Sequence, residues 1–152
     1  MLFEKMAIAM AVMFLCTFIH ALFMIAGDKL VSRRMDRLKT PGHLFARATL
    51  LWLVIMWMFI GICVESSVWA LVYLFTPELT VLSDAQSAFY FSLVTYTTLG
   101  YGDIVLTGDF RVLSAIQAAN GVIIFGWTTA IIIYYIQEIF RSVQGKADTQ
   151  HV

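Results

Sequence analysis

The stretch TTLGYGD, residues 97–103, decides the fold, together with the apolar residues 85–96 (AQSAFYFSLVTY) directly before it. As a helix, those 12 apolar residues would cover about 18 Å, whereas the hydrocarbon core of a bilayer is about 30 Å thick. The sequence therefore predicts a helix that enters a membrane without crossing it. Irregular backbone at membrane depth persists only where it is buried in protein or lines a watery path.

Two glycines at alternate positions give this stretch an unusual backbone. A strip whose carbonyls all face one way needs successive residues of alternating handedness, and Gly100 and Gly102 adopt positive φ without steric cost. We therefore expect a ladder of carbonyls along the strip. The side chains of Leu99 and Tyr101 would then point back into the protein.

TTLGYGD resembles the selectivity-filter signature of potassium channels. The resemblance covers residues 44–140, in which the short helix and the filter stretch are followed by a long apolar helix. It implies an all-α membrane protein with a potassium-channel-like pore module of bacterial type, made of an outer helix, a pore helix, a filter and an inner helix. Because one chain supplies one filter strand, it also implies a homotetramer around a central axis.

The resemblance implies roles for the filter residues and for the residues around them. Backbone carbonyls of the filter, with the Thr98 hydroxyl, would replace the water around K⁺, which is the transported ion, and no cofactor is implied. The ion-binding residues are then Thr98, Leu99, Gly100, Tyr101 and Gly102, with K⁺ held by the first four. The supporting residues are Thr97, Asp103, Tyr90 and Phe91, of which Tyr90 would donate its hydroxyl to Asp103.

The inner helix carries the residues that the resemblance assigns to gating and to the cavity below the filter. Gly121 matches the family's hinge glycine, and Gly126 matches a second glycine for close packing. The residues expected to line the cavity are Val122, Phe125 and Thr129, which follow one another at helical spacing.

The composition independently places the chain in a membrane. Of its 152 residues, 61% are hydrophobic and 13% are charged, whereas a soluble domain carries about 25% charged residues. The net charge is zero, and no basic cluster with aromatic residues suggests nucleic acid as a partner. No Ser-His-Asp set, HExxH, P-loop or dinucleotide-binding pattern is present, so we do not expect an enzyme. The expected partners are K⁺, membrane lipid and further copies of the chain.

Three apolar segments are long enough to span a membrane, namely residues 6–26, 48–64 and 112–137. After Glu65, residues 68–75 would extend the second helix or lie in the interface, and Thr76-Pro77 ends this segment. Residues 27–47 hold six of the ten Lys and Arg residues, so the positive-inside rule places this loop in the cytoplasm. Pro41-Gly42 would break any helix within it. The N-terminus then lies outside and the C-terminus inside, in the inner membrane of a prokaryotic cell by the resemblance.

The chain divides accordingly into four parts. We predict an N-terminal transmembrane helix (1–27), a basic cytoplasmic linker (28–43), the ion-channel pore domain (44–140) and a short cytoplasmic tail (141–152). No segment carries arginines at every third position, so a voltage sensor of the familiar kind is not expected.

Polar residues within the apolar segments leave alternatives open. His20 either lies at the interface or packs against a neighbouring helix, with pH sensing as a further alternative. For Glu65 we favour solvation at the outer edge of the membrane core. The alternative for Glu65 is a place behind the filter, where Val94 stands at the position of a pore-helix carboxylate in several relatives. Gln117 and Asn120 are expected to bond near the pore helix, with a gating role as the alternative.

Three other functions are alternatives to a potassium channel. The same fold could conduct Na⁺ and K⁺ alike, although less selective relatives tend to alter the position of Tyr101. A uniporter-type transporter would carry four degenerate filter-like repeats in one long chain, whereas this chain has one well-formed copy. A non-conducting accessory membrane protein would keep the stretch only as a structural element.

Overall fold

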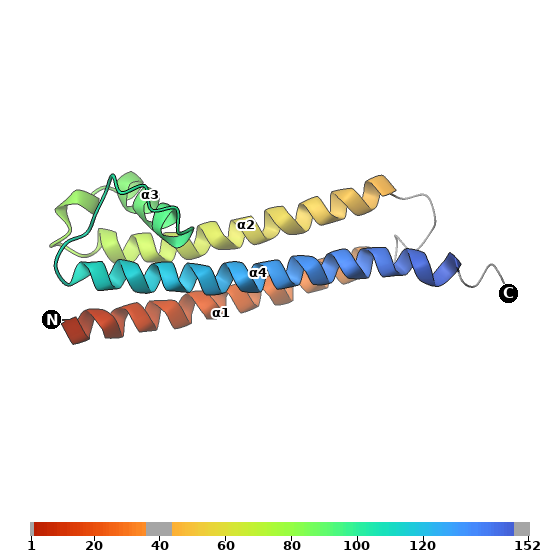
Figure 1. Ribbon diagram of the computed structural model, residues 1–152, viewed down its shortest axis with the longest axis horizontal. Helices are drawn as coiled ribbons and strands as arrows, with labels where there is room; N and C mark the ends of the chain where they lie inside the picture. The colour runs from red at the N-terminus through yellow and green to blue at the C-terminus, as the bar shows by residue number, and fades with distance from the viewer. Residues whose placement is uncertain (1, 36–43, 148–152) are drawn as a thin grey trace.

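The structure is a computed structural model that describes residues 2–35 and 44–147. Within these ranges it is helical and has no strand: α1 (Leu2–Met35), α2 (Leu44–Leu74), the 3-10 helix η2 (Thr80–Leu82), α3 (Ala85–Tyr96) and α4 (Phe110–Ala147). The long helices α1, α2 and α4 run side by side, and α3 lies at the end that also holds the N-terminus (Figure 1). Each of the three is long and apolar enough to cross a membrane. The chain is therefore an all-helical membrane protein.

The helix α3 has the bounds that the sequence predicts, and its ends show why. Asp84 is the N-cap, and its side chain accepts a hydrogen bond of 2.9 Å from the Ser87 amide. The helix stops after Tyr96, where Thr97 donates its amide to the Leu93 carbonyl at 3.0 Å. The buried residues of α3 are Ala88, Phe91, Ser92 and Tyr96.

The helix α1 is longer than the sequence predicts. The expected span ends at residue 26, yet α1 continues through Gly27 to Met35. A glycine inside a helix costs only about 1 kcal/mol, and Gly27 is buried against Trp57 of α2, whose indole Cδ1 lies 3.2 Å from where a Cβ would stand. Trp57 also donates its indole N–H to the Phe23 carbonyl of α1 at 2.9 Å. Packing between α1 and α2 thus overrides the local breaking signal.

The helix α4 also extends past its predicted span, whereas α2 continues beyond Glu65 as the apolar stretch that follows it predicts. The helix α2 passes Glu65 without a break and ends at Leu74, before Thr76-Pro77. The helix α4 reaches Ala147, so that much of the predicted tail is helical, because a nucleated helix continues at little cost beyond its apolar part. Residues 28–35 of the predicted linker belong to α1. The remainder of the linker, with Pro41-Gly42, and the end of the tail lie outside the described residues.

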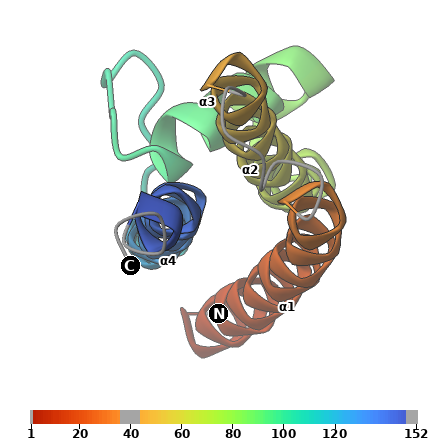
Figure 2. The same cartoon turned by 90° about the vertical axis from the view of Figure 1, so that its right-hand side faces the viewer.

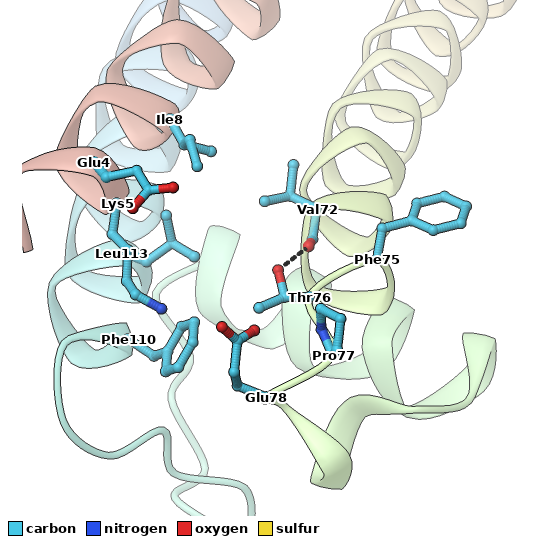
Figure 3. A pocket seen from close by; sticks show the side chains of 10 residues that line it. All are labelled: Glu4, Lys5, Ile8, Val72, Phe75, Thr76, Pro77, Glu78, Phe110 and Leu113. Atoms are coloured by element: carbon cyan, nitrogen blue, oxygen red, sulfur yellow. Dashed lines mark hydrogen bonds between the residues drawn. The ribbon is translucent and has the colours of Figure 1, made fainter. Parts of the chain in front are cut away.

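The helix α1 lies obliquely across the other two long helices (Figure 2). Near its N-terminal end, the Lys5 ammonium lies 3.2 Å from the centre of the Phe110 ring in α4. Toward its other end, Gly27 packs on α2 instead. A cavity of about 440 Å³ lies between α1, α2 and α4 at the end that holds α3, with Glu4 of α1 on one side and Val72 of α2 on the other (Figure 3).

Candidate functional site

The backbone of the TTLGYGD loop alternates in handedness. The φ angle is +60° at Thr98, +54° at Gly100 and +78° at Gly102. Leu99 and Tyr101, which lie between them, have φ outside the positive region. This is the alternation that the sequence predicts for the two glycines. Reasoning from sequence missed Thr98, because positive φ is a genuine outlier for a β-branched residue and nothing in the residue type signals it.

The amide groups of the loop point back toward α3. Leu99 and Gly100 both donate their backbone N–H to the Val94 carbonyl, at 3.0 and 3.3 Å. Thr98 donates its N–H to the Thr95 carbonyl at 3.0 Å. Because the N–H and C=O of a trans peptide point in opposite directions, the carbonyls of Thr98 and Leu99 face away from α3. Val94 therefore anchors the loop through its carbonyl, although it lacks the carboxylate of several relatives.

The side chains of the loop are not buried in this chain, contrary to the prediction. Leu99 is 56% exposed and Tyr101 is 66% exposed. Nothing lies within 4 Å of a Cβ built at Gly100 or Gly102. One chain covers only the side of the loop that faces α3, so it does not supply the protein into which these side chains are expected to point.

Tyr90 and Asp103 form the hydrogen bond that the sequence predicts. The Tyr90 hydroxyl donates to Asp103 Oδ2 at 2.7 Å, and the Ile104 amide donates to Oδ1 at 3.0 Å. The bond from Tyr90 lowers the pKa of Asp103 below its usual 3.8, and the same bond raises the pKa of Tyr90 above its usual 10.0. The far end of the loop is thereby tied to α3 by a charged carboxylate.

The other two predicted supporting residues fix α3 itself. Thr97 donates its hydroxyl to the Leu93 carbonyl at 2.8 Å, at the point where the helix ends. Phe91 is buried and packs edge-on against Tyr73 of α2, with the ring centres 5.2 Å apart. Both contacts hold the helix from which the loop emerges.

Glu65 contradicts the favoured prediction of a solvated carboxylate. Its side chain is fully buried, with Oε2 accepting the Tyr96 hydroxyl at 2.8 Å and Oε1 lying 2.9 Å from His20 Nδ1. His20 is also fully buried rather than interfacial, and its Nε2 lies 3.3 Å from the Thr128 hydroxyl of α4. The prediction failed because depth along one helix does not show which other helices pack around it.

The two membrane amides behave differently from each other. Gln117 donates its Nε2–H to the carbonyl and the hydroxyl of Ser92 in α3, at 3.1 and 2.7 Å, which confirms the prediction for this residue. Its Oε1 accepts the Tyr73 hydroxyl at 2.6 Å. Asn120 instead accepts the indole N–H of Trp69 in α2 at 3.3 Å, and Trp69 belongs to the same buried cluster as Phe91 and Tyr96 of α3, so this bond also lies near the predicted pore helix. One helical turn places the two amides against different neighbours.

The helix α4 passes both predicted functional glycines without interruption. A Cβ at Gly121 would clash with the backbone carbonyl of Tyr96, so glycine is needed for α4 to approach the end of α3. A Cβ at Gly126 has nothing within 4 Å, so the predicted close packing is absent within the described part of this chain. A hinge at either glycine stays a prediction.

The three predicted cavity residues lie on a face of α4 that one chain leaves uncovered. Val122 is 59% exposed, Phe125 is 37% exposed, and Thr129 is also exposed. The Thr129 hydroxyl donates to the Phe125 carbonyl at 2.8 Å, which satisfies it within the helix. Their role in lining a cavity stays a prediction.

A model of the protein family described as ion channel matches residues 62–138, which is just over half of the 152 residues. The matched part begins within α2, includes α3 and the TTLGYGD loop, and ends within α4. The helix α1 lies outside it. The comparisons with curated proteins and with solved structures found no match.

Proposed function

The chain belongs to the ion-channel family, and from this premise we propose that it is a potassium-selective channel in which four copies form one pore. K⁺ passes through this pore passively, down its electrochemical gradient. The TTLGYGD loop is the filter, and the ligands of K⁺ are the backbone carbonyls of Thr98, Leu99, Gly100 and Tyr101.

The observation that carries the proposal is the alternating backbone of the loop. Positive φ at Thr98, Gly100 and Gly102 is the pattern required for carbonyls that face one axis. The amides of Leu99 and Gly100 are engaged by Val94, so the carbonyls on the other side can replace water around a cation. A non-glycine residue at positive φ costs about 1–3 kcal/mol, and such strain concentrates at functional sites.

Four copies supply what one chain lacks. One strand offers one carbonyl at each level, whereas a dehydrated K⁺ needs a ring of them from four loops. Leu99 and Tyr101 beside the loop, and Val122 and Phe125 on α4, are exposed surfaces that neighbouring copies would cover. Repeated around the mouth of the pore, Asp103 would raise the local concentration of cations.

The distribution of charge supports an orientation with the loop at the outer face. The N-terminus of α1 and the helix α3 lie at one end of the molecule (Figure 1), whereas Arg33 and Arg34 lie in the last turn of α1. The positive-inside rule places the arginine end in the cytoplasm. The N-terminus is then outside and the C-terminus inside, and the membrane that we propose is the inner membrane of a prokaryotic cell.

Two alternatives keep the same fold. A non-selective channel would pass Na⁺ as readily as K⁺, but the intact Gly100-Tyr101-Gly102 sequence favours selectivity. A non-conducting accessory protein would pass neither ion. The positive φ of Thr98 argues against it, because strained backbone of this kind concentrates at functional sites.

The test is ion uptake by liposomes that contain the purified protein. We expect vesicles loaded with K⁺ to take up a Rb⁺ tracer, Ba²⁺ to block that uptake, and Na⁺ uptake to stay at the level of protein-free vesicles. Equal uptake of Na⁺ and Rb⁺ would establish the non-selective alternative. Correctly inserted protein without uptake of either ion would refute conduction.

A further inference from the structure

We propose that His20, on the N-terminal helix α1, is a positioning residue for the filter. It holds the Glu65 carboxyl in the orientation in which Glu65 fixes Tyr96, the residue that directly precedes TTLGYGD. The inference rests on the proposed function and extends it, because α1 lies outside residues 62–138, which the family model matches. On this view α1 is part of the ion-selecting structure and not a peripheral anchor.

The contacts form one buried chain of hydrogen bonds across four helices. His20 Nδ1 of α1 lies 2.9 Å from Glu65 Oε1 of α2, and the Tyr96 hydroxyl of α3 donates to Glu65 Oε2 at 2.8 Å. On the other side of the imidazole, Nε2 lies 3.3 Å from the Thr128 hydroxyl of α4. His20, Glu65 and Tyr96 are each 0% exposed. The carboxylate is therefore held from α1 and α3 at once, with both oxygens engaged.

The Glu65 carboxyl depends on His20 for the partner of its Oε1. A buried polar group without a hydrogen-bond partner is costly, so both carboxyl oxygens need one. His20 serves Oε1, and the Tyr96 hydroxyl serves Oε2. The neighbouring Cys16 thiol contacts the Glu65 backbone carbonyl instead, and the Thr128 hydroxyl and Trp127 ring of α4 lie against the imidazole. Removing the imidazole therefore leaves Oε1 without this partner, and the carboxyl can turn away from the Tyr96 hydroxyl.

Tyr96 links Glu65 to the end of α3, on which the filter loop is anchored. Its hydroxyl is fixed by Glu65, while its backbone carbonyl lies against α4 at Gly121, where a Cβ would clash with it. Val94, in the same turn of α3, accepts the amides of Leu99 and the next residue of the loop. A shift at the end of α3 therefore moves the anchor of the filter and turns its carbonyls away from the ion axis.

The test measures the reversal potential of the purified channel between K⁺ and Na⁺ solutions. We expect the K⁺/Na⁺ permeability ratio to fall about tenfold in His20→Gln and in Tyr96→Phe, the change that follows the loss of one buried hydrogen bond. The double variant should fall no further, because both changes break the same chain of contacts. The matched control is Trp57→Phe, which removes a different hydrogen bond between α1 and α2 and should keep the wild-type ratio.

A wild-type ratio in His20→Gln or in Tyr96→Phe overturns the proposal. Losses that multiply in the double variant also overturn it, because a general loosening of the packing gives independent effects. If His20→Gln does not assemble, Tyr96→Phe alone decides, since it removes one oxygen atom and keeps the ring. The unmodified protein is measured first. Failure of that protein to select K⁺ overturns the proposed function, whereas selective wild type with unaffected variants overturns only the role of His20.

Discussion

The two sides of the TTLGYGD loop differ in how completely the chain buries them. Behind the loop, Glu65, Gln117 and Tyr96 are fully buried, and each has a hydrogen-bond partner within the chain. The rest of the surface of the loop, the front, is not covered by the chain, and Leu99 and Tyr101 are more than half exposed there. One chain completes the back of the loop and leaves the front open.

This difference follows from the cost of unsatisfied polar groups in a membrane. A backbone group without a partner in hydrocarbon costs several kcal/mol, so the open front must meet water, an ion or protein. The back supplies a fixed frame, and in the proposed pore the front would acquire its function by assembly of further copies. Substitutions on one side at a time separate the two contributions.

The largest effect is expected at the front, from Gly100→Ala. Gly100 has a φ of +54°. An L-residue in the left-handed region costs roughly 1–2 kcal/mol, and four copies would bear that cost in one filter. Alanine therefore turns the carbonyl away from the axis, and we expect Rb⁺ uptake by liposomes to be abolished while the protein still inserts and assembles.

Gly108→Ala is the matched control for the front of the loop. Gly108 also has positive φ, at +59°, and a Cβ there has nothing within 4 Å, but it lies outside TTLGYGD. It bears the same backbone cost without touching the filter, so uptake should persist. Equal loss of uptake in the two variants would show that strain alone, and not the position of a filter carbonyl, is responsible.

At the back, Gly121→Ala should have the next largest effect. The added methyl group meets the backbone carbonyl of Tyr96, and backbone cannot give way as easily as the end of a flexible side chain. Overpacking of this kind lowers the free energy of unfolding by about 3 kcal/mol. Thermal unfolding in detergent measures it, with Gly126→Ala as the control on the same helix, because a Cβ at Gly126 has open space in the chain. Equal stability of the two variants would contradict the close contact.

A smaller loss of stability is expected when the residues behind the loop keep their shape but lose hydrogen-bond partners. Gln117→Leu leaves the buried Tyr73 hydroxyl without its acceptor, and Ser92 loses two bonds from the amide. We expect the free energy of unfolding to fall by about 2 kcal/mol. Ser114→Ala, which removes an exposed hydroxyl from the same helix, is the control. A Gln117→Leu variant as stable as this control would show that the amide is dispensable.

The smallest effect concerns pH at the front, through the exposed pair Tyr90 and Asp103. The pKa of Asp103 is lowered below 3.8. The hydrogen bond to its carboxylate therefore stabilises the folded protein above that pH, and this stabilisation is lost as the pH falls through the lowered pKa. The pKa of Tyr90 is raised above 10.0. The hydrogen bond from its hydroxyl therefore stabilises the folded protein below that pH, and this stabilisation is lost as the pH rises through the raised pKa. Tyr90→Phe should therefore reduce selectivity by the same modest factor at every pH between about 5 and 9. A factor that changes within this window would contradict the two pKa directions.

The predictable parts of the molecule are those encoded locally. The bounds of α3 follow from the apolar run and its Asp84 cap, and positive φ at Gly100 follows from the residue type. The bond between Tyr90 and Asp103 joins residues only 13 positions apart, from the middle of α3 to the end of the loop. Short-range pattern is sufficient for the helix and the glycine, and the resemblance of the local motif supplies the bond.

The parts that sequence reasoning missed depend on contacts between distant segments. Glu65 meets His20 across 45 positions, and His20 meets Thr128 across 108. Neither hydropathy nor helix length shows which helix faces which, so a buried carboxylate was taken for a solvated one. The exposure of Leu99 was missed for the opposite reason, because the wall expected around the loop is not supplied by one chain.

The most direct test of the central claim is a density map of the purified assembly, determined in K⁺. We expect four copies around one axis, with the carbonyls of Thr98, Leu99, Gly100 and Tyr101 facing ion density on that axis. An assembly of any other symmetry, or carbonyls turned away from an axis that holds no cation, would contradict it.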